Sequence, residues 1–118
     1  DAANVDLKVL SEDFYREFVF VRRVVFVVGD PVAGFMAMDE EHDPTAVTAL
    51  YVATPGQGLG RALLDLAKKR HQSLDVWTFQ ANSGARRFYE REGLHQLRET
   101  DGDNEEGLPD VLYRWEAA

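Results

Sequence analysis

The chain has 118 residues, a length that fits one domain with a core of its own. Hydrophobic residues at 45% and charged residues at 29% are ordinary for a globular protein. The formal net charge of −8 disfavours nucleic acid as a partner. It suits a cationic small molecule or a basic peptide, although acidic surfaces also serve solubility alone.

Membrane and metal functions are not indicated. No apolar run reaches the roughly 18 residues of a membrane span, and no signal pattern is visible. The absence of cysteine excludes disulfides and thiolate metal sites. His42, His71 and His95 lie far apart in the sequence, which favours separate surface histidines over a metal site. We therefore expect a cytoplasmic protein without a membrane anchor or a bound metal.

Residues 1–18 mix polar and apolar side chains. Ser11 begins a sequence typical of a helix start. Four apolar side chains lie near helical spacing, namely Val5, Val9, Phe14 and Phe18. This pattern predicts one or two helices over Asp1–Phe18.

Two β-branched and aromatic segments follow. Phe20–Val28 and Val32–Met38 are separated by Gly29-Asp30-Pro31, which predicts an antiparallel hairpin. The charged segment Asp39–Pro44 then reads as a solvated loop, with a substrate contact as the alternative.

The next segment is a strand that runs directly into a helix. Ala46–Ala53 predicts the strand, and the helix extends to about Lys69. Its apolar stripe consists of Leu59, Ala62, Leu63, Leu66 and Ala67. The turn between them contains three glycines, Gly56, Gly58 and Gly60.

That glycine-rich turn favours an anion site. Without Cβ atoms, main-chain N–H groups can approach an anion closely, and the helix N-terminus adds partial positive charge. The pattern is neither the P-loop signature nor G-x-G-x-x-G. On the residues alone, a phosphate or pyrophosphate cradle and a simple tight turn both remain open.

The last third of the chain alternates strand and helix. Leu74–Phe79 predicts a strand, and a helix then starts at Asn82 or Ser83 and closes at Gly93. Leu94–Thr100 and Leu108–Trp115 predict the last two strands. Helices between strands and an early hairpin indicate an α/β (α+β) fold. We expect a mixed, mostly antiparallel sheet of about six strands with helices on both faces.

The glycine block resembles motif A of the GNAT superfamily of acetyl-coenzyme A (acetyl-CoA)-dependent N-acetyltransferases. In that motif a strand reading L-Y-V leads into (Q/R)-x-x-G-x-(G/A) and a helix. Leu50-Tyr51-Val52 matches the strand, and Gly58 and Gly60 match the small positions. Pro55 departs from the expected Gln or Arg, a role that Gln57 takes, and the loop is shorter than usual.

A second block resembles motif B of the same superfamily, N-x-x-A-x-x-F-Y-x-x-x-G-(F/L). The matching residues are Asn82, Ala85, Phe88, Tyr89, Gly93 and Leu94. The resemblance covers roughly residues 20–115. The R-x-A-x-x-D pattern of the family's first strand is not found. We therefore expect residues 1–118 to form a single GNAT domain in which that strand is missing or degenerate.

The resemblance implies a V-shaped opening between Ala46–Ala53 and Leu74–Gln80 that holds acetyl-CoA as cosubstrate. The acetyl group would pass to a primary amine of a small molecule or peptide by direct attack. Tyr89 would be the general acid, with packing at the sheet surface and a hydroxyl bonded to backbone as the alternative. Asn82 would hold the cofactor arm or act only as a helix cap. The implied cofactor-binding residues are Leu50, Val52, Gln57, Gly58, Leu59, Gly60, Arg61, Asn82 and Tyr89. Arg86 or Arg87 could reach the adenosine phosphate, but exposed helix arginines usually make no specific contact, which is the favoured alternative.

Other features leave alternatives open. Trp77, Phe79 and Trp115 could wall an acceptor pocket or pack in the core. The general base is not visible, and a homodimer fits as well as a monomer. The competing hypothesis for function is a GNAT-like module that binds acetyl-CoA as a sensor or scaffold with little catalysis. A purely structural domain would leave both motifs without a role.

Overall fold

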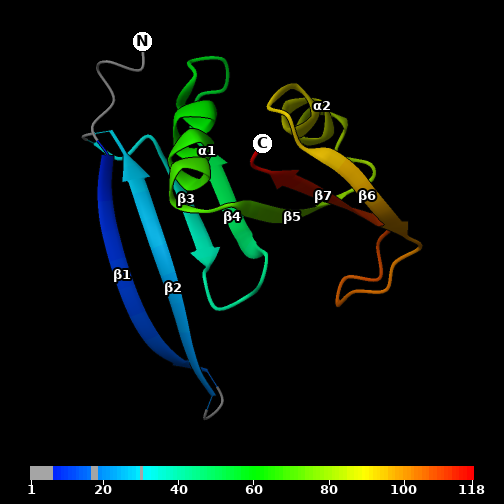
Figure 1. Cartoon of the computed structure of the whole chain (residues 1–118), viewed down its shortest axis with the longest axis horizontal. Coiled ribbons are helices and arrows are strands. Elements are labelled where there is room, and N and C mark those ends of the chain that lie inside the picture. The colour runs from blue at the N-terminus through cyan, green and yellow to red at the C-terminus, as the bar shows by residue number, and fades with distance from the viewer. Residues whose placement is uncertain (1–6, 17–18, 30) are drawn as a thin grey trace.

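The described residues form a single seven-stranded sheet with two helices (Figure 1). The computed structural model describes residues 7–16, 19–29 and 31–118, with side chains from residue 24 onward. The elements in chain order are β1 (Leu7–Arg16), β2 (Val19–Val28), β3 (Gly34–Asp39), β4 (Thr45–Val52), α1 (Leu59–Arg70), β5 (Ser73–Phe79), α2 (Ser83–Arg91), β6 (His95–Thr100) and β7 (Asp110–Glu116). None of the helices in the described part is long and apolar enough to cross a membrane.

The strand order is β1-β2-β3-β4-β5-β7-β6. Among the described strands only β4 and β5 pair in parallel, and all other neighbours are antiparallel. The parallel pair follows from the α1 crossover, because parallel neighbours cannot be joined by a tight turn. The mixed, mostly antiparallel α/β class expected from the sequence is confirmed.

One hydrophobic core joins the helices to the sheet. In β2 and β3 alternate residues are buried, as the period of a strand requires. These are Val24, Phe26, Val28, Met36 and Met38. The α1 side chains of Leu63, Leu64 and Ala67 are fully buried against them. Tyr89 of α2 and Leu94 extend the same core toward β7.

Both helices cover the same face of the sheet at β7. The ring of Tyr89 in α2 lies 6.0 Å from that of Tyr113. Lys68 Nζ in α1 lies 5.6 Å from the ring centroid of Trp115. Tyr113 and Trp115 are two residues apart on one strand and so face the same side. The expected helices on both faces are therefore not found among the described residues.

The predicted N-terminal helices are wrong over residues 7–16, which form β1. Residues 1–6 and 17–18 of that prediction lie outside the described residues. All ten residues of β1 pair with β2, from Leu7↔Val28 to Arg16↔Val19. This ladder satisfies the backbone polar groups of β1 that face β2, and such pairing outweighs a weak helical spacing. The added strand explains why the sheet has seven strands, not about six.

Candidate active site

The sheet opens between β4 and β5. These strands pair only at Thr45↔Leu74, Ala46↔Asp75 and Val47↔Val76, and then separate. At the same point the register between β3 and β4 shifts, so that Thr48 is the extra residue of a β-bulge. A bulge bends its strand and increases the local twist. The bulge therefore turns the end of β4 away from β5, at the position where the sequence resemblance implies a V-shaped opening.

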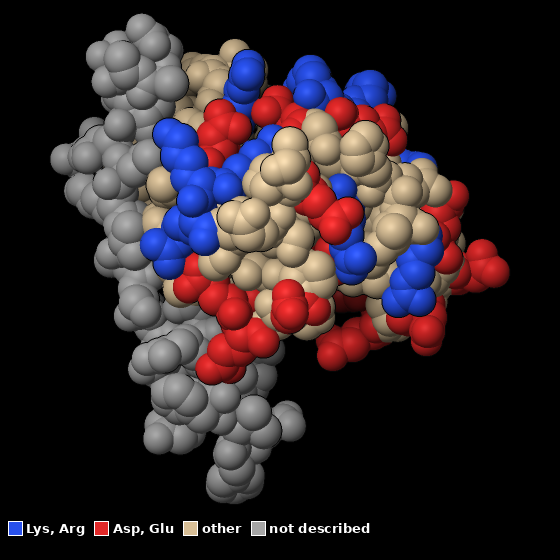
Figure 2. All heavy atoms as spheres, viewed as in Figure 1, with Lys and Arg blue, Asp and Glu red and all other residues tan. Residues whose placement is uncertain are grey.

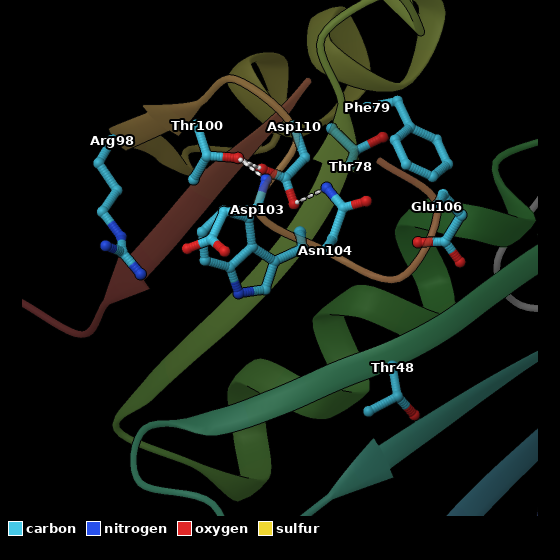
Figure 3. Close-up of a pocket in the computed structure, with 10 residues that line it drawn as sticks. Thr48, Thr78, Phe79, Arg98, Thr100, Asp103, Asn104, Glu106 and Asp110 are labelled. Carbon is cyan, nitrogen blue, oxygen red and sulfur yellow. Dashed lines mark hydrogen bonds between the residues drawn. The ribbon is translucent and has the colours of Figure 1, made fainter. Parts of the chain in front are cut away.

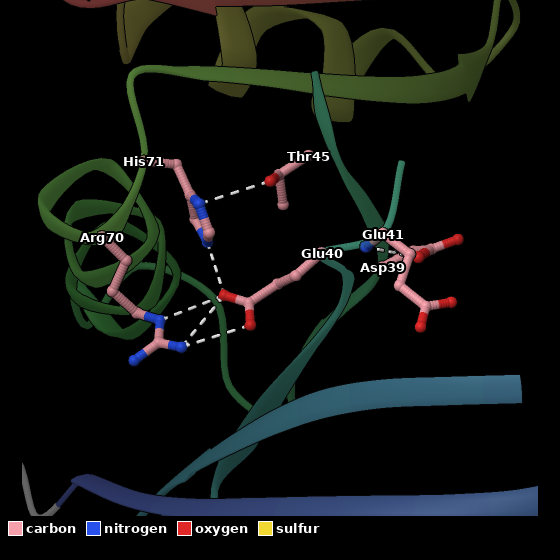
Figure 4. A network of polar contacts seen from close by, with 6 residues as sticks. All are labelled: Asp39, Glu40, Glu41, Thr45, Arg70 and His71. Carbon is pink, nitrogen blue, oxygen red and sulfur yellow. Dashed lines mark hydrogen bonds and ion pairs between the residues drawn. The ribbon is translucent and has the colours of Figure 1, made fainter. Parts of the chain in front are cut away.

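Polar contacts hold the closed end of this opening together (Figure 4). His71, just after α1, contacts the Glu40 carboxylate through Nε2 at 2.5 Å and the Thr45 hydroxyl through Nδ1 at 3.3 Å. Arg70 also donates to Glu40, at 3.0 Å. The contacts join the ends of β3 and α1 to the start of β4, so β4 and β5 diverge from a fixed point.

The glycine turn leaves α1 with an open N-terminus. Gly58 is the N-cap residue, with φ 75° and ψ 8°, and no side chain caps the helix. The Ala62 amide donates to the Gly58 carbonyl at 3.0 Å. The amides of Leu59, Gly60 and Arg61 therefore precede the helical ladder and have no acceptor within it. No acidic side chain lies in the first turn. This arrangement is the one that binds phosphate groups at helix N-termini.

Gly60 allows close packing beside the glycine turn. A Cβ atom on Gly60 would lie 3.3 Å from Phe88 Cζ and 3.6 Å from Val52 Cγ2. Its absence lets α1 approach α2 and the end of β4 closely. A Cβ on Gly58 would meet no atom within 4 Å, so the space beside Gly58 is open.

A cavity of about 620 Å³ lies where α1, α2 and the end of β4 meet. We call it the glycine-turn cavity. Its lining consists of Leu50, Val52, Pro55, Gly56, Gly58, Leu59, Gly60, Arg61, Gly84, Ala85, Phe88, Tyr89, Arg91 and Glu92. The sequence analysis named nine candidate cofactor-binding residues, and seven of them line this cavity. They are Leu50, Val52, Gly58, Leu59, Gly60, Arg61 and Tyr89.

Tyr89 is buried, yet its hydroxyl is available. The structure shows no hydrogen bond from this hydroxyl to any described residue, and none of the buried side-chain polar atoms in the described part lacks a partner. The hydroxyl must therefore be accessible, and the cavity is the space that Tyr89 lines. Burial raises the pKa of Tyr89 to about 12. The phenol is thus fully protonated near neutral pH and can donate a hydrogen bond.

Asn82 caps α2, since its Oδ1 accepts the Ala85 amide at 3.0 Å. Neither Asn82 nor Gln57 is among the residues that line the glycine-turn cavity. The suggested phosphate contact of Arg86 is not supported, because its side chain donates to Tyr113, Gln80 and Gln96 instead. Asn82 as a cofactor ligand and Gln57 as a substitute for the motif residue therefore stay predictions.

The cation that does reach the cavity from α2 is Arg91, which the sequence analysis did not single out. Its guanidinium lies 5.9 Å from the Phe88 ring. Gly84, Phe88 and Arg91 lie at helical spacing, which is the signal that could have identified it. Arg61 lies on the α1 side, where it is 3.6 Å from Glu92 and 3.9 Å from Asp65. Two arginines thus border a helix N-terminus that can bind an anion.

A second cavity, of about 550 Å³, lies beside the opening, on the sheet face away from the helices (Figure 3). We call it the loop cavity, because the β6–β7 loop overhangs it. Its lining consists of Thr48, Trp77, Thr78, Phe79, Arg98, Thr100, Asp103, Asn104, Glu106 and Asp110. Trp77 is 43% exposed and Phe79 is 37% exposed, so these rings form a cavity wall and are not core. Trp115, by contrast, packs against the core.

The β6–β7 loop is held by its own polar contacts. Asp110 binds the Thr100 hydroxyl and accepts from Asn104 Nδ2 at 3.1 Å. Asn104 Nδ2 also donates to the Leu108 carbonyl at 2.6 Å. Figure 2 shows acidic side chains along the lower edge of the coloured part of the molecule, where Figure 1 places the β3–β4 and β6–β7 loops. The loop cavity therefore lies at an acidic edge of the protein.

The comparisons with known proteins agree with this architecture. A family profile described as "Acetyltransferase (GNAT) domain" matches residues 14–94, and the chain belongs to this family. A search of curated proteins returned no match.

Solved structures share the fold. A crystal structure from Desulfovibrio desulfuricans, described as a candidate GNAT acetyltransferase, is 25% identical, with 81% of this chain and 70% of that chain covered and a TM-score of 0.67. A GNAT acetyltransferase from Elizabethkingia anophelis, solved with acetyl-CoA bound, is 13% identical, with 96% and 98% covered and a TM-score of 0.75. One from Bacillus cereus is 16% identical, with 80% and 70% covered and a TM-score of 0.69.

Proposed function

We propose that the protein transfers the acetyl group of acetyl-CoA to a primary amine of a small molecule or peptide. The observation that carries this proposal is one cavity that is lined both by an uncapped helix N-terminus and by Tyr89, whose hydroxyl is accessible. The first of these suits a pyrophosphate, and the second suits a departing sulfur atom. Family membership and the acetyl-CoA complex of a structural neighbour support the same cosubstrate.

The cosubstrate would lie along the glycine-turn cavity. Main-chain amides of Gly58–Arg61 would bind the pyrophosphate, and Arg61 and Arg91 would add positive charge beside it. Past its pairing with β5, β4 has a free edge at Leu50 and Val52. Amide groups of the cosubstrate arm can pair with that edge as an added strand would. The thioester would then lie in the opening between β4 and β5.

Tyr89 would act on the departing sulfur. The amine nitrogen forms a bond to the thioester carbon, the carbon–sulfur bond breaks, and the electron pair of that bond goes to sulfur. A phenol with a pKa of about 12 is a weaker acid than a thiol, whose pKa is about 8.5. Tyr89 therefore contributes as a hydrogen-bond donor that stabilises the developing thiolate and keeps its own proton. The nitrogen loses one proton to solvent as the amide forms, and the thiolate takes up one proton from solvent, so the protons balance.

The amine would enter from the loop cavity. Thr48 lines this cavity and Leu50 lines the glycine-turn cavity, and the two residues are two positions apart on β4. Both cavities therefore border the segment of β4 at the opening. Carboxylates of Asp103 and Glu106 line the loop cavity and would attract a cationic acceptor.

The proposal is tested in two steps. Thermal unfolding is measured with and without acetyl-CoA, and coenzyme A release is then followed with a panel of amines. We expect a rise in Tm with acetyl-CoA and turnover with at least one class of amine. A rise in Tm without turnover on any amine would favour the alternative of a sensing or scaffold module. The absence of any rise would contradict the cofactor site itself.

A further inference from the structure

One cation in the loop cavity has no carboxylate partner. Arg98 lines this cavity, and no ion pair or hydrogen bond joins its guanidinium to any other described residue. Its one recorded contact is with Trp77, whose ring centroid lies 5.2 Å from Arg98 Cζ. The chain carries a net charge of −8, and Asp103 and Glu106 line the same cavity. Arg98 is therefore a cation that shares a cavity with carboxylates but pairs with neither of them.

The register of the sheet explains how Arg98 is placed. Trp77 on β5 lies opposite Leu112 on β7, and Leu112 lies opposite Arg98 on β6. Cross-strand partners share a face, so the three side chains form one row. Val76 and Tyr113, next to this row, face the helices, so the row faces the loop cavity. The guanidinium therefore crosses the width of β7 to reach the indole.

This arrangement prepares Arg98 for an anion. The contact with the Trp77 ring holds the guanidinium 5.2 Å from the ring centroid without using its N–H groups, which remain free. A planar group with free N–H pairs binds a carboxylate through two parallel hydrogen bonds. Figure 3 shows Arg98 on one side of the cavity and Glu106 on the other, with Asp103 between them. The cavity thus presents a cation at one side, the Glu106 carboxylate at the other and the Asp103 carboxylate between them.

We propose that Arg98 determines acceptor specificity by binding a carboxylate of the acceptor, which makes the acceptor a zwitterion of the amino-acid type. The inference rests on the proposed function. The ammonium group is attracted to the side of Glu106 and Asp103, and the carboxylate pairs with Arg98. A volume of about 550 Å³ suits a small molecule of this kind, and the exposed faces of Trp77 and Phe79 supply apolar contact for its side chain.

The test compares free proteinogenic amino acids with the corresponding amino-acid carboxamides as acceptors. The pairs differ in the carboxylate, and the ratio of kcat/KM for acid over amide is measured in the wild type, in Arg98→Gln and in Arg87→Gln. Comparing this ratio between variants cancels differences in amine basicity. Arg87 is an exposed arginine of α2 that lines neither cavity. Any contact of Arg87 with the cosubstrate would change kcat/KM for acid and amide equally, so Arg87→Gln is a matched control for the ratio.

We expect Arg98→Gln to lower the acid-over-amide ratio about tenfold or more, as the loss of a charge-assisted hydrogen bond implies. Arg98→Lys keeps the charge but not the planar fork and should recover only part of the ratio. Arg87→Gln should leave the ratio unchanged. An equal ratio in wild type and Arg98→Gln would overturn the inference while turnover itself still supports the proposed function.

A second readout does not depend on turnover. In a Trp115→Phe background, Trp77 is the remaining tryptophan, and it lies in the cavity. Its fluorescence is titrated with the same acids and amides, with and without Arg98→Gln. Tighter binding of the acids that depends on Arg98 supports the inference even if no acetyl transfer is seen. Equal binding of acids and amides, or no response to either, contradicts it.

Discussion

Replacing Gly58 by alanine distinguishes loss of anion binding from loss of fold stability. Gly58 has φ 75°, and a Cβ atom there meets no neighbour within 4 Å. The methyl group would therefore occupy open space beside the helix N-terminus in the glycine-turn cavity. Gly93 is a matched control, because it has φ 90°, an equally open Cβ position, and no place in that cavity.

The expected magnitudes follow from these two positions. A left-handed conformation costs a non-glycine residue roughly 1–2 kcal/mol, so both variants should lose about that much stability and about 3–8 °C in Tm. Only Gly58→Ala should also lose ligand affinity, by about tenfold, because its methyl group separates the amides from the pyrophosphate. At a ligand concentration about 100 times the wild-type Kd, stabilisation should fall from about 2.7 to about 1.4 kcal/mol.

Calorimetric titration with coenzyme A and thermal unfolding with and without it measure both effects. Gly93→Ala should bind coenzyme A as the wild type does, although it is less stable. If a folded Gly58→Ala protein binds with wild-type affinity, the glycine turn is only a turn. If Gly93→Ala loses affinity equally, the effect reports general destabilisation, and the cradle argument fails.

Two further predictions concern α2. Asn82→Ala should cost about 1 kcal/mol of stability through loss of the helix cap. Asn82→Ser can still cap the helix, so it should restore stability and kcat together. Recovery of stability without recovery of kcat would instead show that Asn82 contacts the cofactor. The pKa of Tyr89 is raised from 10.0 to about 12, so the folded state keeps a proton that the unfolded chain loses between these values. Stability should therefore fall by up to about 3 kcal/mol as pH rises through this window, and Tyr89→Phe should remove that part of the fall in denaturant titrations. An unchanged fall would contradict the burial argument.

Periodicity and turn residues were sufficient for most of the fold. From β2 onward each predicted strand and helix exists, because local pattern and tertiary contacts agree there. The exception is β1, where a sparse helical spacing competes with a ten-residue ladder to β2. Such pairing is non-local, so it is not visible in a window of sequence around residues 7–16.

The candidate site was predictable to a similar extent. Motif spacing identified Gly58, Gly60 and Tyr89, which line one cavity. The contact between Arg98 and Trp77 could not be predicted, because it depends on the order β5-β7-β6 and on a register shift between Gln96 and Arg98. A register shift of one residue moves side chains to the other face. The sequence alone does not fix that register.

The central claim is that Tyr89 donates to the departing sulfur, and the measurement that tests it most directly is kcat of Tyr89→Phe beside Tyr113→Phe. Tyr113 is fully buried, and its hydroxyl donates to Glu90 at 2.7 Å and accepts from Arg86 at 3.2 Å, so its loss should lower stability while kcat is kept. We predict that Tyr89→Phe keeps coenzyme A affinity and lowers kcat by roughly 10²-fold where chemistry limits the rate. A wild-type kcat in Tyr89→Phe, or an equal loss in Tyr113→Phe, would contradict the account.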